Sequence, residues 1–139
     1  MTNEENIDAL RKIIEASGGL DRYVDEDEEK TIFQEGEKLG LVQPSVANIL
    51  NQICRRNQWT RELDIKNDLR DQLDETIVDD GSIDQGEFEH CVNYAVAMNM
   101  PRRRATELCV RYVTAKNLKI KKPWLGKDWF ALLRKQYGL

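Results

Sequence analysis

The chain has little histidine and no long apolar run. It therefore lacks features that are common in enzymes and in transmembrane proteins. Among its 139 residues there is one histidine, and no apolar run approaches the roughly 20 residues of a membrane-spanning helix. Gly18-Gly19 lacks the following Lys-Ser or Lys-Thr of a phosphate-binding loop. Residues 1–5 are polar and acidic, unlike a signal peptide. We therefore expect a cytoplasmic protein that is not an enzyme, because no acid, base and nucleophile converge in the pattern.

The three cysteines, Cys54, Cys91 and Cys109, are predicted to be free and buried. Their number is odd, and their spacing matches neither zinc nor redox motifs. Free cysteine packs as a small hydrophobe and persists in a reducing compartment. His90 adjoins Cys91, but neighbours in a helix point about 100° apart, so this pair does not form a nucleophile and base. We expect His90 at the surface.

Two segments 59 residues apart share the same pattern of Asp, a β-branched residue, Asp and Glu. The first is residues 21–28 and the second is residues 80–87. The register continues downstream without a gap, so that Ile32 aligns with Cys91. An internal repeat of this length indicates a duplicated structural unit.

Apolar residues recur at helical spacing along most of the chain, and no segment alternates convincingly with the period of a strand. The expected helices span about 4–16, 25–39, 44–56, 60–77, 84–98, 101–116 and 128–136. This pattern predicts an all-α fold of about seven helices. We expect one domain over residues 1–139, in which two pseudo-symmetric three-helix repeats, about 4–57 and 60–117, pack together because each is small. A basic connector and closing helix, 118–139, would follow.

The repeated acidic motif has a structural interpretation and a metal-binding one. Asp-x-x-Glu at the start of a helix is a capping box, in which each side chain accepts from the other residue's backbone N–H. The same residues resemble the second part of an EF-hand loop, but Thr76 and Val78 stand at its first and third positions, where calcium needs oxygen ligands. A degenerate EF-hand-like calcium binder and weak divalent-cation binding remain the alternatives to a purely structural cap. The candidate metal ligands are Asp21, Asp25, Glu28, Asp80, Asp84 and Glu87.

The repeated order of acidic turn, aliphatic residue, capped helix and second helix resembles the TerB-like (tellurite-resistance) domain family. The resemblance is carried by residues 80–87, by Leu39-Gly40-Leu41 and by their partners in the other copy, and it covers about residues 7–117. It implies a compact seven-helix fold that is cytoplasmic and non-enzymatic. It also implies an acidic surface for metal ions and a link to stress-response or chaperone-associated systems.

The charges are divided unevenly between the two parts of the chain. Residues 1–90 contain 23 acidic and 10 basic side chains, whereas residues 91–139 contain 2 acidic and 11 basic ones. The basic part is either a solvated face or a binding surface for an acidic partner. We expect another protein as the partner, with nucleic acid as the alternative, and no membrane; the oligomeric state stays open. The candidate partner-binding residues are Arg102, Arg103, Arg104, Lys119, Lys121, Lys122 and Trp124.

Overall fold

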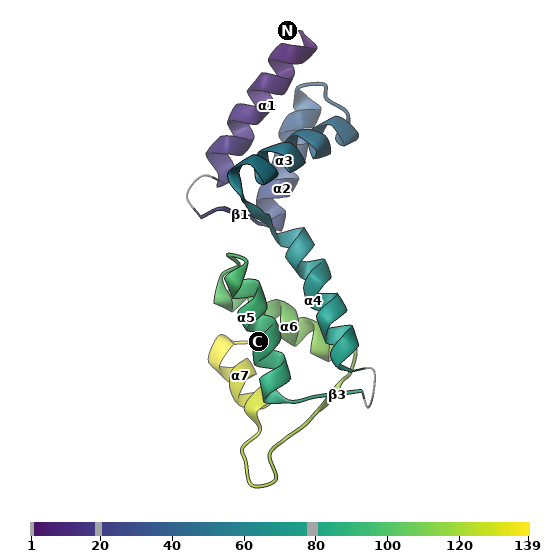
Figure 1. The fold of residues 1–139 in the computed structure, drawn as a ribbon, viewed down its shortest axis with the longest axis vertical. Helices are drawn as coiled ribbons and strands as arrows, with labels where there is room; N and C mark the ends of the chain where they lie inside the picture. The colour runs from purple at the N-terminus through teal and green to yellow at the C-terminus, as the bar shows by residue number, and fades with distance from the viewer. Residues whose placement is uncertain (1, 19–20, 78–80) are drawn as a thin grey trace. The chain divides into compact units, whose positions relative to one another are not determined.

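The computed structural model describes residues 2–18, 21–77 and 81–139, and most of this part of the chain is helical (Figure 1). The helices found there are α1 (Asn3–Gly18), α2 (Glu26–Lys38), α3 (Gln43–Asn57), α4 (Glu62–Thr76), α5 (Gln85–Ala97), α6 (Arg102–Ala115) and α7 (Trp129–Tyr137). The prediction of an all-α fold with about seven helices is confirmed. No helix in the described ranges is long and apolar enough to span a membrane.

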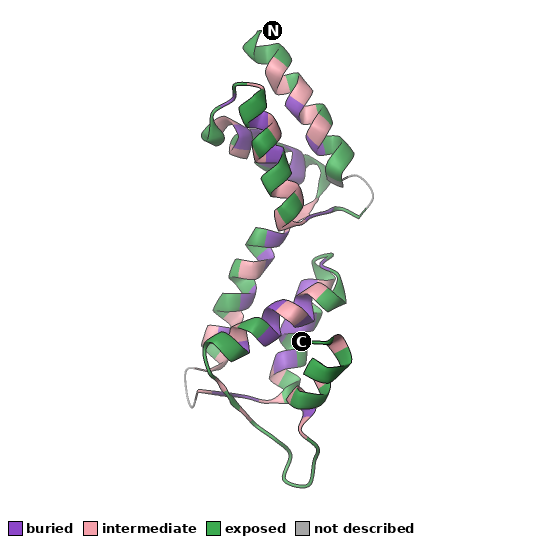
Figure 2. Cartoon of the chain, turned by 180° about the vertical axis from the view of Figure 1, so that it is seen from behind, coloured by how far each residue is buried: buried purple, intermediate pink, exposed green. Residues whose placement is uncertain are grey.

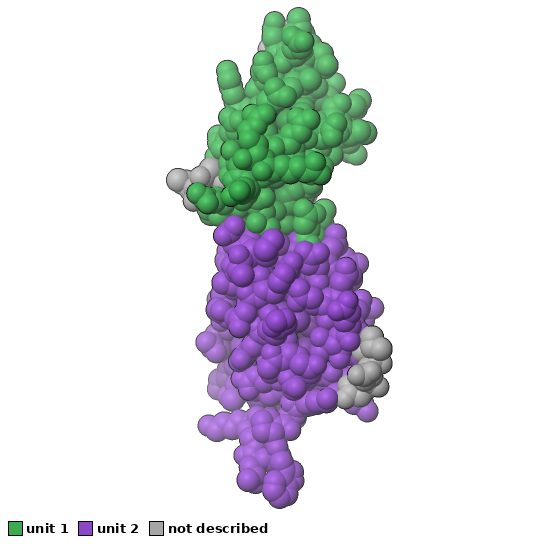
Figure 3. Space-filling view, in the orientation of Figure 1, with its two compact units in different colours: residues 1–64 green, residues 65–139 purple. Residues whose placement is uncertain are grey.

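The chain divides into two compact units, Met1–Asp64 (unit 1) and Ile65–Leu139 (unit 2), shown in Figure 3. The helix α4 begins in unit 1 and continues in unit 2. The single domain built from two packed repeats stays a prediction.

Unit 1 has a core between α1, α2 and α3. Leu10 and Ile14 lie one turn apart on α1 and are both completely buried, as are Ile32 of α2 and Leu50 of α3. Figure 2 shows these helices buried along one side and exposed along the other. Burying each such side chain stabilises the fold by about 1.5–3 kcal/mol relative to leaving it in water.

Unit 2 has its own core, in which α5 packs against α6 and α7 covers the pair. Phe88 of α5 is 2% exposed, and its ring lies 5.5 Å from that of Trp129 at the start of α7. The helix α4 contributes Leu69 and Leu73, which are spaced one turn apart and are both buried. Each unit therefore buries apolar residues of its own.

All three cysteines are buried and free, as the sequence predicts. Burial raises the pKa of the Cys54 and Cys91 thiols to about 11 and that of Cys109 to about 12. The thiols are therefore protonated at neutral pH and lack the thiolate that nucleophilic chemistry requires. His90 is exposed, also as predicted.

Four strands of two residues each were not expected from the sequence, because so short a segment cannot show an alternating pattern. They are β1 (Tyr23–Val24), β2 (Thr60–Arg61), β3 (Ser82–Ile83) and β4 (Lys119–Ile120). β1 pairs with β2 and β3 with β4, both in parallel. The second ladder joins residues 59 positions beyond those of the first, so the two ladders occupy equivalent places in the duplicated sequence.

Positive backbone φ angles recur at the same offset of 59 residues. In the described part of the chain, six of the seven residues with positive φ form three pairs separated by 59 positions: Arg22 and Gly81, Gly40 and Asn99, and Gln58 and Asn117. Left-handed backbone is uncommon for residues other than glycine, so its recurrence at equivalent positions is informative. These pairs support the duplication, whose three-dimensional symmetry stays a prediction.

Candidate partner-binding surface

The acidic turn of unit 1 uses its carboxylates to hold local backbone. Asp25 is the N-cap of α2, and its Oδ1 accepts from Glu28 N at 2.7 Å. Asp21 Oδ1 accepts from Tyr23 N at 3.2 Å. Burial of Glu28, its side-chain hydrogen bond to Asp25 and the negative charges of Asp25 and Asp21 raise the pKa of Glu28 to about 7. The turn is thus a helix cap that contains one partly protonated carboxyl at neutral pH.

Two neighbouring interactions that were not predicted from the sequence complete this turn. Arg61 forms an ion pair with Glu29 in which both side chains are mostly buried. Glu62, which is 2% exposed, accepts from Glu26 N at 3.2 Å through its Oε2. A carboxylate from the start of α4 therefore satisfies the first turn of α2, where backbone N–H groups lack partners within the helix. No signal in the sequence links residues 26 and 62, which the β1–β2 pairing brings together.

The acidic turn of unit 2 forms the predicted capping box. Asp84 Oδ1 accepts from Glu87 N at 2.7 Å, and Glu87 Oε1 accepts from Asp84 N at 3.1 Å. The remaining candidate ligand, Asp80, lies outside the described residues. Among the residues that are described, no three His, Cys, Asp or Glu side chains group so that they could hold a metal ion.

The basic triplet at the start of α6 contacts other parts of unit 2. Arg102 donates to Asn93 Oδ1 of α5 at 2.9 Å, and Arg103 donates to the Tyr137 carbonyl of α7 at 3.2 Å. Arg104 lies 3.6 Å from Glu107 on its own helix. Two of the three arginines thus connect helices of unit 2.

The segment between β4 and α7, residues 121–128, is here called the Trp124 loop, and Figure 1 shows it extending away from the helices of unit 2. Gly126 N donates to the Pro123 carbonyl at 3.1 Å, which closes a turn around Trp124 and Leu125. Both apolar side chains are in water, with 95% and 91% of their surfaces exposed. Lys119, Lys121 and Lys122, which the sequence predicted as partner-binding residues, are also exposed, as is Lys127.

The base of the Trp124 loop is anchored to unit 2. Lys121 N donates to the Ile83 carbonyl at 2.8 Å, and the Lys121 carbonyl accepts from Trp129 Nε1 at 2.8 Å. Lys122 Nζ lies 3.2 Å from Asp128. A hollow of about 430 Å³ lies between this base and the first turn of α5, lined by Asp84, Gln85, Gly86, Lys121, Lys122, Pro123 and Trp129.

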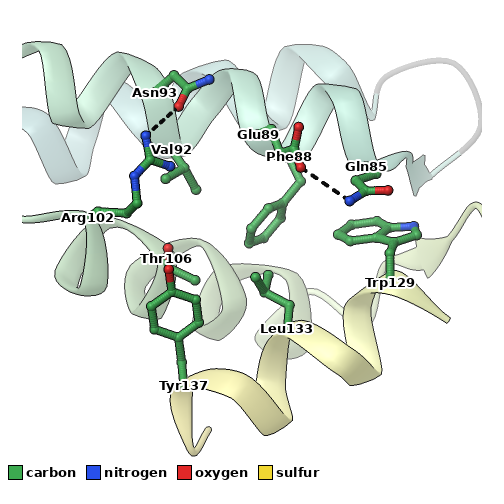
Figure 4. Close-up of a pocket in the computed structure, with 10 residues that line it drawn as sticks. All are labelled: Gln85, Phe88, Glu89, Val92, Asn93, Arg102, Thr106, Trp129, Leu133 and Tyr137. Carbon is green, nitrogen blue, oxygen red and sulfur yellow. Dashed lines mark hydrogen bonds between the residues drawn. The ribbon is translucent and has the colours of Figure 1, made fainter.

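A second hollow, of about 260 Å³, lies between α5, α6 and α7 (Figure 4). The aromatic rings of Phe88, Trp129 and Tyr137 line it together with the Arg102–Asn93 hydrogen bond. Gln85 donates to Glu89 at its other end. Four of its polar side chains form these two hydrogen-bonded pairs, so this hollow resembles imperfect packing beneath α7 more than a reaction centre.

Leu125 and Lys127 belong to the exposed surface but were not singled out from the sequence. The available signal was their position between the basic connector and the closing helix, next to Trp124. No family model, curated protein or solved structure matches the chain. Its function is therefore inferred from the side chains themselves.

Proposed function

We propose that the chain is a non-enzymatic helical interaction module that binds an acidic protein segment through the Trp124 loop. The observation that carries this proposal is the exposure of Trp124 and Leu125 among four lysines. Two large neighbouring apolar side chains in water, in a mostly basic segment, are typical of a surface that a partner covers. We place this module in the cytoplasm, where free thiols persist.

The two kinds of side chain would contribute differently to binding. Burial of Trp124 and Leu125 supplies affinity, and tryptophan is among the residues most often dominant at protein interfaces. The lysines steer an acidic segment toward the loop and disfavour basic partners. A partner with carboxylates next to leucine or phenylalanine side chains matches this combination.

Comparison of the two sequence copies supports a carboxylate beside the loop. In unit 1, Glu62 accepts from Glu26 N in the first turn of α2. The equivalent residues 59 positions later are Lys121 and Gln85, at the first turn of α5. Lysine has no acceptor to offer, and the 430 Å³ hollow adjoins this turn. A carboxylate from the partner would take the place that Glu62 takes in unit 1.

Nucleic acid has less support as the partner, because Arg102 and Arg103 contact Asn93 and Tyr137 within unit 2. Membership of the TerB-like family and a stress-related role remain proposals supported by the repeated capped turns. Weak divalent-cation binding gains no support from the acidic side chains that the structure describes, since they accept backbone hydrogen bonds.

Selection from a displayed library of random peptides tests the proposal, since it does not require the partner to be identified. We expect enrichment of peptides that combine acidic and large apolar residues. Replacement of both Trp124 and Leu125 by Ser should weaken the best peptides by at least about 30-fold, the effect of losing a dominant contact of about 2 kcal/mol. Fluorescence anisotropy with labelled peptides measures this loss.

The matched control is Leu132→Ser, which removes a half-exposed leucine from α7 outside the loop and should leave peptide affinity unchanged. Enrichment of basic peptides would contradict the proposal. Equal peptide affinities for the wild type and the Trp124/Leu125 variant would also contradict it, as would tighter binding of labelled duplex or single-stranded DNA.

A further inference from the structure

Unit 2 contains an apolar cavity of about 270 Å³ between α4 and α6, which we call the α4–α6 cavity. None of its lining residues belongs to the Trp124 loop or to the hollow beneath α7. Leu69 and Leu73 of α4 and Leu108 of α6 form its apolar part, and each of these residues is at most 8% exposed. The cavity can therefore hold an apolar group away from water.

The charged side chains that line this cavity are all positive. Lys66 and Arg70 come from α4 and Arg111 comes from α6, and no acidic residue is among the lining residues, although the whole chain has a net charge of −4. Arg70 donates to the neutral Asn67 side chain at 2.6 Å, which leaves its charge uncompensated by that contact. Arg111 pairs with Glu107 on its own helix, and its side chain is 65% exposed. An apolar cavity with a cationic rim favours a ligand that is apolar at one end and anionic at the other.

Tyr112 also lines the cavity and carries a polar group. Its hydroxyl oxygen is buried and has no hydrogen-bond partner among the described residues. A buried polar group without a partner is costly, and such groups in folded proteins call for a specific explanation. A ligand carboxylate that reached this hydroxyl on binding would accept a hydrogen bond from it and remove the cost.

We propose that the α4–α6 cavity binds a small carboxylate with an apolar tail, of the medium-chain fatty acid class. The leucines hold the tail, and Arg70, Arg111 and the Tyr112 hydroxyl hold the carboxylate. The volume of about 270 Å³ is just below the ~300 Å³ at which pockets for drug-sized ligands begin, which favours a short tail. This site is independent of the proposed function of the Trp124 loop.

Titrations of the full chain with four probes separate the contributions of tail and charge. Octanoate contains both, octanol lacks the charge, acetate lacks the tail, and octylammonium reverses the charge. We expect octanoate to bind most tightly and octylammonium more weakly than octanol. Backbone amide shifts in a two-dimensional NMR spectrum should concentrate at residues 66–73 and 108–115.

Substitutions test which side chains contact the ligand carboxylate. Replacing Arg70 and Arg111 by Gln should weaken octanoate by about 10-fold, because an exposed ion pair contributes up to about fivefold, and should leave octanol unchanged. Tyr112→Phe should weaken octanoate by about 2- to 10-fold, the effect of one hydrogen bond. Arg134→Gln, which removes an exposed arginine from α7, is the matched control and should change nothing.

Several results would overturn the proposal: no octanoate binding up to about 10 mM, equal affinities for octanoate and octanol, or unchanged affinity in the Arg70/Arg111 variant. Shifts confined to α5 and α7 would assign the ligand to the other hollow. If an acidic peptide from the library selection moved the cavity amides while octanoate did not, the cavity would belong to a protein partner. Both arginines are exposed, so their replacement tests the site even if the Tyr112 variant fails to fold.

Discussion

Glu28 is expected to make the stability of the acidic turn depend on pH. Its Oε2 is buried without a hydrogen-bond partner in the described part of unit 1, and Asp25 and Asp21 add negative charge nearby. These surroundings favour the protonated carboxyl and raise its pKa from 4.5 to about 7. The contribution of Glu28 to stability is therefore full below about pH 4.5 and is lost as the pH rises through about 7.

We predict that Glu28→Gln makes the free energy of unfolding less dependent on pH between about 4.5 and 7. Above pH 7 the variant should be more stable than the wild type, because it does not place a charge in the buried position. Urea denaturation at about pH 5, 6, 7 and 8 measures the effect. Asp27→Asn on the exposed side of the same helix is the control, and its free energy of unfolding should depend on pH as that of the wild type does. Parallel profiles for wild type and Glu28→Gln would refute the assignment.

The capped helices are the elements that the sequence predicted best. Asp25 and Asp84 each begin a helix, and both accept from the backbone N–H three residues later. A cap depends on residues close in the sequence, so its pattern is visible without the fold. The short strands depend on partners 37 residues away, and Glu62 meets Glu26 N from 36 positions away beside the first of these pairings. These contacts could not be found from local periodicity.

The capping box of α5 should have a measurable energetic effect. Asp84→Ala removes the acceptor for Glu87 N and should lower the free energy of unfolding by about 1 kcal/mol. Asp84→Asn retains an acceptor and should restore most of the loss. Urea denaturation measures the change, and hydrogen exchange at the first turn of α5 locates it. Equal stability for the Ala and Asn variants would show that the side chain does not cap the helix.

The division into two units predicts that one unit can be destabilised without the other, because each unit buries its own apolar residues. In unit 1 the helices pack closely at Gly36 of α2. A Cβ placed there would lie 2.5 Å from Val46 Cγ2 of α3, shorter than any ordinary contact. Overpacking costs about 1–3 kcal/mol, which exceeds the roughly 1 kcal/mol that alanine gains over glycine in a helix.

Gly36→Ala should therefore lower the stability of unit 1 by up to about 2 kcal/mol. Native-state hydrogen exchange should reveal faster exchange at Leu10, Ile32 and Leu50, with unchanged protection at Phe88 and Cys109 in unit 2. Gly86→Ala is the matched control, because its added Cβ meets Asp84 Oδ1 at an ordinary 3.4 Å. A uniform loss of protection across residues 1–139 would instead support the single domain expected from the sequence.

The candidate partner-binding surface was also predicted only in part, because some of its features depend on the fold. Charge asymmetry and the isolated Trp124 pointed to the basic part of the chain, but could not tell Arg102 from Lys122. The structure shows that Arg102 binds Asn93 of α5 and that Lys122 pairs with Asp128 within the loop, while Trp124 and Leu125 extend into water. The α4–α6 cavity was not foreseen, since its lining residues on the two helices are at least 35 positions apart in the sequence.

The helices, the caps and the buried thiols follow from the amino-acid sequence alone, because each depends on residue type and on spacing of a few positions. The repeat at an offset of 59 residues is also visible there, because it is a match between two stretches of sequence. Tertiary structure decides which polar residues pair, which basic residues stay exposed and where cavities remain. Glu62 illustrates the difference: it is 2% exposed and accepts a hydrogen bond from Glu26 N, 36 positions earlier. Burial of a carboxylate leaves no apolar pattern in the sequence, so it is visible only in the folded chain.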